Sequence, residues 1–573
     1  MSHAKVDAVT VEIVGNLLLT IAEEIGISII KSAYSTNIKE RRDISTAVFD
    51  PEGRLVAQAE HVPMHLGSLL SIVEEVYKKY PLDAIRPGDM FIGNDPYNGG
   101  GTHLPDITIV APVFAGRKLI GWVANLAHHS DVGGKVPGST SGDAVSIFQE
   151  GIKIPISKIC REHQVNQEIV DFIMTNSRIP EERYGDLHAQ IASNRVGIRR
   201  LLEAHEQYGD LLVESMYELQ NYAERRLKAG IEKLPDGVYE FTDFMDDAGA
   251  ASPDPIKLSV KITIQGDAME LDFAGSHPQV NGPINVTYNG LLATVFYAIK
   301  ALIDPDIYSN AGIYRAFVIK VEPGLIINAR NPAPVGARID TCMRVADVIF
   351  GAMAPVVPER AIAGCNSSCT TAVFSGYDPR DPDQFYVYLE TIAGGAGASR
   401  NADGLSGVQV HLTNTSNLPI EALEMEFPLV IVREYSLIED SGGAGRHRGG
   451  LGIRRAFEAR FDNVSFTGLG DRQKFLPWGL NGGADGAGGA YRLERADGTV
   501  QRLPSKCTEI PLNKGDRITI HTPGAGGYGD PKKRDPREVL QDVIERKVSI
   551  REAKQSYGVA IERTAGGYEI VES

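Results

Sequence analysis

The sequence predicts an α+β chain of several domains whose second half is rich in β-strands. Its 573 residues are too many for one hydrophobic core, because a domain takes roughly 100–200 residues. Stretches with helical spacing of apolar residues give way to stretches in which apolar and polar residues alternate, and no low-complexity linker separates them. These changes of pattern predict the regions 1–165, 166–235, 236–380, 381–530 and 531–573.

The first region is predicted to begin with a long amphipathic helix, from Asp7 to about Ser35, in which apolar residues recur every three or four positions. Two short strands at 44–50 and 54–62 follow, joined by the turn PEG, and a helix covers 67–79. A hairpin comes next, because the apolar strands ITIVAPVF and LIGWVANLA flank a very short turn that contains glycine.

The later regions follow from the same two patterns. Residues 168–233 are predicted to be helical and charged, 237–273 to form strands, and 289–302 to form another helix. Mixed strand and loop lead into the segment 385–521, which is rich in strands and glycine. A charged helical tail is predicted to start near Pro536.

Glycine is the unusual component of this composition. The chain has 60 glycines, more than the average share of roughly 7%. They cluster between apolar runs, in segments such as AGGAGASRNADG, DSGGAGRHRGGLG and TPGAGGYGD. We expect these segments to pack closely as extended or polyproline-II strands, because no side chains hold their backbones apart.

Charge and cysteine content narrow the classes of function. The formal net charge is -16, and an acidic surface repels phosphate backbones and anionic lipid, so we expect neither nucleic acid nor a membrane as a partner. There is no run of 18 or more apolar residues, and the N-terminus lacks the features of a signal peptide. The five cysteines are scattered, and Cys365 and Cys369 have no second pair to close a zinc ribbon. We predict buried free thiols and a cytoplasmic protein.

The predicted hairpin carries the candidate chemistry. His103 and Asp106 form an H-x-x-D pattern just before its first strand, and His128 follows its second strand. A two-residue loop at Gly116 and Arg117 makes paired positions sum to about 233, which places Asp106 opposite Ala127 and brings the three side chains to the open end of the hairpin. Imidazole and carboxylate ligands suit Zn, Mn or Fe and leave positions open for water or substrate.

A second interpretation of these histidines stays open at this point, because histidines at a strand end are often surface or hydrogen-bonded residues. His61, His65 and Asp43 are further candidates nearby. His65 alone is more typical of a core histidine or of one that supports a ligand.

Two common enzyme signatures are absent from the sequence. It contains no G-x-x-x-x-G-K-[ST] phosphate loop and no G-x-S-x-G nucleophile elbow. Neither a P-loop nucleotide site nor a serine hydrolase of that type is expected.

Several long motifs, in order along nearly the whole chain, resemble the hydantoinase B/oxoprolinase family. They include RRDISTAVFDPEGRLVAQAEHVPMHLGSL, GNDPYNGGGTHLPDITIVAPVF, AHHSDVGGKVPGS, LDFAGSHPQVNGPINV, DSGGAGRHRGGLGIRR and TPGAGGYGDP. The resemblance implies a metal-bearing subunit related to those of ATP-dependent hydantoinases, 5-oxoprolinases and caprolactamase, and of acetone and acetophenone carboxylases. It also implies barrel-like β-sheets, a glycine-rich polyproline-II bundle and peripheral helices.

The resemblance further implies which residues act. Carried over position by position, the metal ligands fall on His103, Asp106 and His128, with Asp43 as a fourth. His129 and Asp131 match the family pattern as residues that support the ligands or act as catalytic proton acceptors.

The resemblance also implies partners. ATP would be bound by a hydantoinase A-type subunit, which phosphorylates a small cyclic amide or ketone, in an α2β2-type assembly. The leading hypothesis is an ATP-dependent cyclic-amide hydrolase subunit of the hydantoinase or 5-oxoprolinase type. A subunit of a ketone carboxylase and a non-catalytic scaffold subunit are the alternatives.

Overall fold

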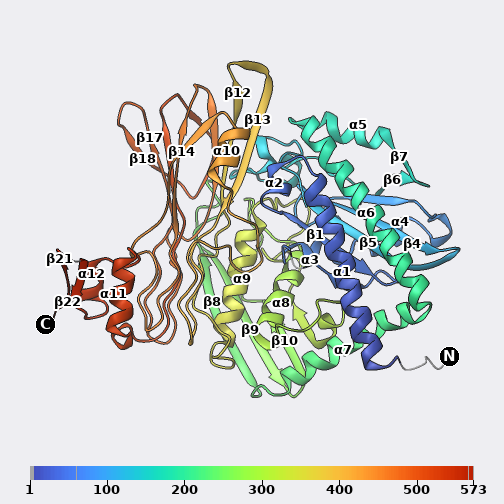
Figure 1. Cartoon of the computed structure of the whole chain (residues 1–573), viewed down its shortest axis with the longest axis horizontal. Coiled ribbons are helices and arrows are strands. Elements are labelled where there is room, and N and C mark those ends of the chain that lie inside the picture. Colours follow the sequence, from blue (N-terminus) through green and yellow to red (C-terminus); the bar gives the residue numbers. More distant parts are fainter. Residues whose placement is uncertain (1–5, 60, 566, 572–573) are drawn as a thin grey trace.

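The computed structural model describes residues 6–59, 61–565 and 567–571. Figure 1 shows two unequal halves: the first half of the chain and the middle region form one body of helices and sheets, and the strands of the second half stand beside it. The C-terminal elements lie at the far side of these strands, away from the N-terminus. Helix and sheet are mixed as predicted, and strands dominate after residue 369.

A seven-stranded sheet organises the first half, in the order β2-β1-β5-β4-β3-β6-β7. Its strands are β1 (Ile44–Phe49), β2 (Leu55–Gln58), β3 (Met90–Gly93), β4 (Asp106–Ala115), β5 (Lys118–His128), β6 (Ser157–Arg161) and β7 (Gln164–Val165). Both faces are buried, which explains the nearly continuous apolar runs of β4 and β5.

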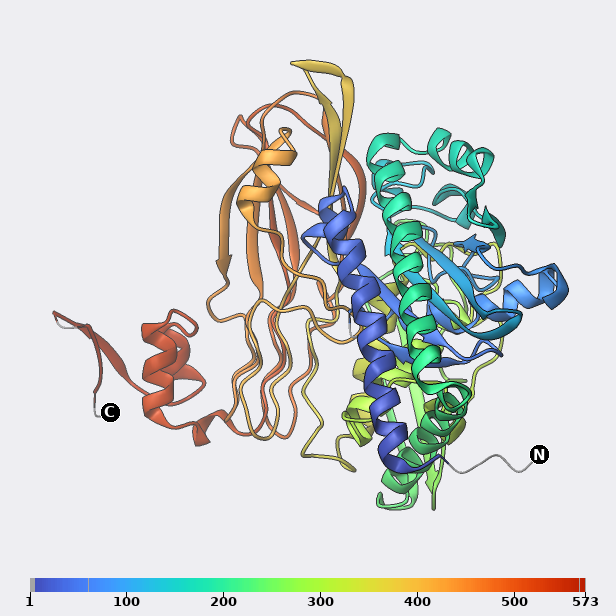
Figure 2. The same cartoon turned by 45° about the vertical axis from the view of Figure 1, so that its right-hand side comes forward.

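Helices cover one face of this sheet. They are α1 (Ala8–Ser32), α2 (Thr36–Lys39), α5 (Gln167–Thr175), α6 (Pro180–Tyr208) and α7 (Leu211–Ile231). Asp7 caps α1 by accepting the N–H groups of Val9 and Thr10. Figure 2 shows α1 and α6 side by side across the sheet. By length and composition alone α1 could cross a membrane, but 44% of its most apolar window is buried inside the chain.

The other face packs on the middle of the chain, in one shared core. The predicted helix over 67–79 is two helices, α3 (His65–Leu70) and α4 (Ile72–Lys79). A four-stranded sheet, in the order β11-β10-β9-β8, packs against one long helix, which in turn packs against a second. These elements are β8 (Gly237–Met245), β9 (Ile256–Gln265), β10 (Ala268–Asp272), α8 (Tyr288–Ile303), β11 (Phe317–Lys320) and α9 (Arg338–Met353).

Helix α9 was not predicted, since the sequence indicated mixed strand and loop there. All of its residues but Ile339 are buried, although its charged residues Asp340, Arg344 and Asp347 recur at the helical spacing of four and three positions. Arg338, Asp340, Arg344 and Asp347 lie within it, and all are buried. This helix therefore brings charged groups into the centre of the molecule.

The second half contains two open sheets, in the orders β13-β12-β16-β19 and β14-β15-β20-β17-β18. Their elements are β12 (Thr370–Asp378), β13 (Asp381–Ile392), α10 (Ile420–Glu426), β14 (Val430–Leu437), β15 (Ile453–Ala459), β16 (Val464–Leu469), β17 (Ala490–Glu494), β18 (Val500–Leu503), β19 (Lys506–Leu512) and β20 (Arg517–His521). The expectation of barrel-like sheets needs correction, because no sheet of the described residues closes on itself.

Glycine-rich segments pack backbone to backbone beneath these sheets, as predicted. Figure 1 shows them as long, nearly parallel strands of irregular chain. The N–H of Gly526 donates to the Gly364 carbonyl, and that of Ala525 donates to Gly450. A Cβ atom on Gly397 would lie 1.8 Å from the Ala363 carbonyl oxygen. Only glycine permits so close an approach.

The C-terminal region is only partly the helical tail that was predicted. It contains α11 (Pro536–Ile544) and α12 (Ile550–Gln555), followed by a hairpin of β21 (Ile561–Thr564) and β22 (Gly567–Ile570). The buried Arg448 lies within hydrogen-bonding distance of the Gly449 carbonyl and near Asp542, which anchors α11 to the glycine-rich segments. The five domain boundaries proposed from sequence stay predictions.

Candidate metal centre

The hairpin of β4 and β5 has the predicted loop and a shifted register. Ala115 pairs with Lys118, as expected for a loop at Gly116 and Arg117. A β-bulge between Val113 and Phe114 then moves the register by one residue, so that Asp106 pairs with His128 and not with Ala127. Cross-strand partners project from the same face of a sheet. The bulge therefore improves the convergence that the sequence predicted.

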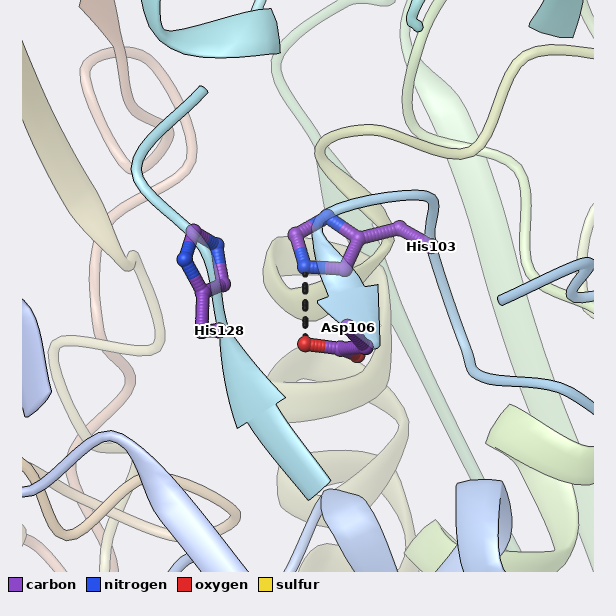
Figure 3. A group of neighbouring side chains, drawn as sticks. All are labelled: His103, Asp106 and His128. Atoms are coloured by element: carbon purple, nitrogen blue, oxygen red, sulfur yellow. Dashed lines mark hydrogen bonds and ion pairs between the residues drawn. The ribbon is translucent and has the colours of Figure 1, made fainter. Parts of the chain in front are cut away.

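His103, Asp106 and His128 converge as predicted, and all three are buried. One potential ligand atom from each lies within 4.8 Å of the other two. His103 Nε2 is 3.1 Å from Asp106 Oδ1, and the rings of His103 and His128 have centroids 4.9 Å apart. Figure 3 shows the rings of His103 and His128 side by side, with a dashed line from His103 to the Asp106 carboxylate.

The second oxygen of Asp106 is held by helix α9. Arg338 donates to Asp106 Oδ2 at 2.9 Å and to the Thr102 hydroxyl at 2.9 Å, and that hydroxyl donates to the same oxygen at 3.1 Å. Burial alone would raise the pKa of Asp106, but His103 and Arg338 hold it well below its ordinary value. Oδ2 is thus occupied, and Oδ1 faces the histidines.

His103 is oriented by a backbone carbonyl. Its Nδ1 lies 3.2 Å from the carbonyl oxygen of Gly336. The loop that carries this carbonyl is held by the buried Glu150, which accepts the N–H groups of Val335 at 2.9 Å and Gly336 at 2.7 Å. Burial raises the pKa of Glu150 to about 8. Metal-binding histidines characteristically have such an acceptor on the second nitrogen.

Asp43 and His65 lie at the edge of the group. His65 Nε2 is 3.6 Å from an oxygen of Asp43 and 3.6 Å from Asp106 Oδ1. The Asp43 backbone carbonyl accepts the N–H of His128 at 3.0 Å. Asp43 is not one of the three residues whose ligand atoms lie within 4.8 Å of one another, and its role as fourth ligand stays a prediction.

An internal cavity of about 60 Å³ opens at this group. Asp43, His65, His103 and His128 line it, together with Asp340 of α9. The Asp340 carboxylate accepts the Cys369 N–H at 2.6 Å. Burial and the neighbouring Asp471 raise the pKa of Asp340 to about 7, which is the range expected of a proton acceptor near neutral pH.

His129 and Asp131 are not brought to this cavity. His129 Nε2 lies 2.9 Å from the Gln190 side-chain oxygen of α6. Asp131 accepts N–H groups from Gly133, Gly138 and Arg178, and it also pairs with the Arg178 guanidinium at 3.0 Å. These positions favour a role in holding the segment after β5. Neither residue lines the cavity, and their catalytic role stays a prediction.

His61 is also separate from the group. It lines a second cavity of about 420 Å³ with Tyr297 and His411. Burial lowers its pKa to about 4.

Sequence reasoning missed Arg338, Asp340 and Glu150. Arg338 and Asp340 lie in the buried helix α9, which was not predicted, and Glu150 follows a glycine-rich loop. Their only sequence signal was a charged residue inside a glycine-rich or apolar stretch, which does not identify a partner more than 180 residues away.

The donor set fits a divalent ion. Burial lowers the pKa of His128 to about 3 and also lowers that of His103, so both rings are neutral and can donate a lone pair near neutral pH. With bonds of about 2.0–2.2 Å, ligand atoms on one ion lie roughly 3–4 Å apart. The observed spacing is close to this range.

Fold and site together define a class: an α+β protein with two histidines and one carboxylate buried at the end of a β-hairpin, beside an internal cavity. A family model described as hydantoinase B/oxoprolinase matches residues 7–531. The chain belongs to this family.

Sequence relatives of nearly equal length agree with this assignment. An uncharacterized protein of Methanocaldococcus jannaschii is 41% identical over 97% of this chain and 96% of its own length. A protein of Pseudomonas sp. strain NS671 described as the B component of a D-/L-hydantoinase is 32% identical, with the same coverage of 97% and 96%.

Two solved structures share the fold. The ATP-dependent caprolactamase from Pseudomonas jessenii matches with a TM-score of 0.89 and 29% identity, over 98% of each chain. The nucleotide-free acetone carboxylase structure matches with a TM-score of 0.92 over 99% of this chain and 81% of that one. Its identity is 20%, so this likeness concerns the fold alone.

Proposed function

We propose that this chain is the metal-containing subunit of an ATP-dependent cyclic-amide hydrolase of the hydantoinase or 5-oxoprolinase type. The observation that carries the proposal is the buried group of His103, Asp106 and His128 beside a cavity, in a chain of the hydantoinase B/oxoprolinase family. A divalent ion there, Zn, Mn or Fe, would supply Lewis-acid chemistry and make water a competent nucleophile near neutral pH.

The chemistry needs activation before water can attack. An unstrained amide has a poor leaving group and a weakly electrophilic carbonyl carbon. Transfer of a phosphoryl group from ATP to the carbonyl oxygen removes this limit, because it gives an imidate-like ester. A hydantoinase A-type partner subunit would carry out that step, in an α2β2-type assembly in the cytoplasm. The absence of a P-loop from this chain is consistent with such a division of labour.

The residues of this chain then have distinct tasks. Arg338 and Thr102 hold Asp106, and Gly336 holds the ring of His103. Asp340, in the same cavity, accepts the proton that attacking water loses. Asp43 is proposed as a fourth ligand, and His129 and Asp131 as residues that position the end of β5.

A ketone carboxylase subunit is the second candidate. The family resemblance also implies this activity, and the likeness to acetone carboxylase shows only that the fold is compatible with it. The sequence relatives favour the hydrolase, since those at 31–32% identity over nearly the whole chain are described as the B component of a hydantoinase and as the beta component of the caprolactamase of Pseudomonas jessenii. A scaffold without catalytic function is the third candidate.

The first experiment separates an enzyme from a scaffold. His103→Ala with His128→Ala, assayed with the partner subunit, is expected to lose the bound metal and to lower substrate-dependent turnover by roughly 10³-fold or more. His163→Ala with His277→Ala removes two histidines that do not line either cavity, and serves as the matched control. Unchanged turnover in the first variant would support the scaffold interpretation.

The second experiment separates hydrolase from carboxylase. ATP consumption is followed with a hydantoin or 5-oxoproline in one series and with a ketone plus bicarbonate in another. The hydrolase predicts substrate-dependent ATP use in the first series. ATP use only with ketone and bicarbonate would refute it.

A further inference from the structure

A second buried group of metal-ligand type lies outside the site described above. It consists of Asp347 of α9, Cys365 just before β12, and His411 in the segment after β13, and all three are buried. One potential ligand atom from each lies within 4.8 Å of the other two. Among the described residues, the hairpin site is the only other group that meets this criterion.

The aspartate of this group is held as Asp106 is held. Asp347 Oδ2 accepts hydrogen bonds from the Arg472 guanidinium and from the Ser367 hydroxyl, each with a donor–acceptor distance of 2.6 Å. Its Oδ1 lies 2.9 Å from His411 Nε2. In the hairpin site an arginine and a hydroxyl likewise occupy Oδ2, and Oδ1 lies 3.1 Å from a histidine Nε2.

The histidines also correspond. The second nitrogen of His411, Nδ1, lies 3.4 Å from the Tyr297 hydroxyl. This arrangement matches that of His103, whose Nδ1 faces the Gly336 carbonyl. In both groups one ring nitrogen faces the carboxylate and the other has an oxygen partner, which is the usual support of a metal-binding imidazole.

The third donor differs between the two groups. Where the hairpin site has His128, this group has Cys365, whose Sγ accepts the N–H of Gly397 at 3.2 Å. Position 397 requires glycine, because a Cβ there would lie 1.8 Å from the Ala363 carbonyl oxygen. The lack of a side chain lets the Gly397 N–H reach the sulfur.

We propose that Asp347, Cys365 and His411 form a second divalent-metal site, of the mixed thiolate, imidazole and carboxylate type that selects zinc. His411 also lines the cavity of about 420 Å³, so water can complete the coordination from that side. Burial would lower the pKa of His411, but Cys365, Tyr297 and Asp347 raise it well above its ordinary value. On binding, the Cys365 thiol proton and the imidazolium proton of His411 therefore both pass to solvent, and metal uptake weakens as the pH falls.

The position of the site suggests what it does. Its ligands come from the buried helix α9, from the entry to the β12 sheet and from the segment after β13. An ion there would tie the middle of the chain to its glycine-rich second half. The alternative is a cysteine, histidine and aspartate that are hydrogen-bonded to one another and bind no metal.

Cobalt distinguishes the two sites, because only the second contains a thiolate. The full-length protein is stripped with a chelator and reloaded with Co²⁺. Metal per chain is measured by mass spectrometry of the element, and the thiolate-to-cobalt charge-transfer band is measured in the near ultraviolet. The wild type is expected to bind two ions per chain and to show the band.

The variants assign each ion to its site. Cys365→Ser is expected to lose the band and one ion, whereas His103→Ala with His128→Ala loses one ion and keeps the band. Cys160→Ser is the matched control, since Cys160 is also buried but belongs to neither group and lines neither cavity, and it is expected to keep both ions and the band. One ion per chain without a thiolate band in the wild type, or a band that persists in Cys365→Ser, would overturn the proposal.

Discussion

Glu150 offers a test of whether the candidate site depends on residues far from it in sequence. Its two carboxylate oxygens accept the backbone N–H groups of Val335 and Gly336, and the Gly336 carbonyl faces His103 Nδ1. Above pH 8, where the Glu150 carboxyl is ionised, Glu150→Gln turns one acceptor oxygen into an NH₂ group that faces an N–H donor. The side-chain volume is almost unchanged, so the substitution tests hydrogen bonding and not packing.

The magnitude follows from these contacts. A buried N–H group left without an acceptor costs about 1–3 kcal/mol, and the loop can relieve this cost only by moving Gly336 away. His103 then loses the acceptor of its second nitrogen, a change that typically weakens metal affinity about 10–100-fold, which is about 1.4–2.7 kcal/mol. We expect a loss of metal affinity in this range and a lower melting temperature.

The assay is competition for Zn²⁺ with a chromophoric chelator, together with thermal unfolding of the metal-free protein. Asp246→Asn is the matched control, because Asp246 also accepts backbone N–H groups, from Gln473, Lys474 and Phe475, but does not line the cavity at the candidate site. It is expected to lower the stability without a change in metal affinity at the hairpin site. If Glu150→Gln binds Zn²⁺ as tightly as the wild type, the reasoning about the Gly336 loop is wrong.

Three further predictions concern the proton acceptor, the glycine bundle and the metal. The pKa of Asp340 is raised to about 7. Because a proton acceptor must be ionised, turnover should rise as the pH rises through about 7. Asp340→Asn should lower turnover about 10²–10⁴-fold and remove this rise from the pH–rate profile. Gly397→Ala places a Cβ 1.8 Å from a carbonyl oxygen and should destabilise the fold by more than about 3 kcal/mol in denaturant unfolding. Gly498→Ala has open space around it at φ +87° and should cost only about 1 kcal/mol. Removal of divalent metal with a chelator should lower the melting temperature, and Zn²⁺ should restore it. An ion that binds only the folded state, at a concentration 100 times its Kd, stabilises that state by about 2.7 kcal/mol. An unchanged melting temperature would argue against a metal in either site.

Local patterns predicted the elements whose apolar residues recur at helical spacing or form continuous runs around a short turn. Helix α1, the hairpin of β4 and β5, and helices α6 and α8 lie close to their expected positions. Helix α9 was missed although Asp340, Arg344 and Asp347 follow a helical spacing. Charged residues are rarely buried unless they are paired, and the pairing of these residues depends on the tertiary structure.

In the hairpin of β4 and β5, counting residues from the loop predicts the strand register only as far as the β-bulge. Counting from the loop placed Ala115 opposite Lys118 correctly, but one bulged residue in β5 moved every later pair. The position of a bulge depends on how the strand packs against its other neighbours. Next to this bulge, Gly121 lies close to β1: a Cβ there would be 2.6 Å from the Phe49 carbonyl oxygen. No feature of the hairpin sequence itself reports that neighbour.

The sequence alone thus determined the α+β class, the family resemblance and the trio His103, Asp106 and His128, because these depend on residues within one hairpin or on contiguous motifs. Only the tertiary structure decided that Arg338 holds Asp106, that Asp340 shares the cavity, that Glu150 fixes the loop behind His103, and that the sheets stay open. Each of these facts depends on segments far apart in the chain that meet through burial. Burial is a property of the folded molecule, and local spacing carries no record of which distant segments will share it.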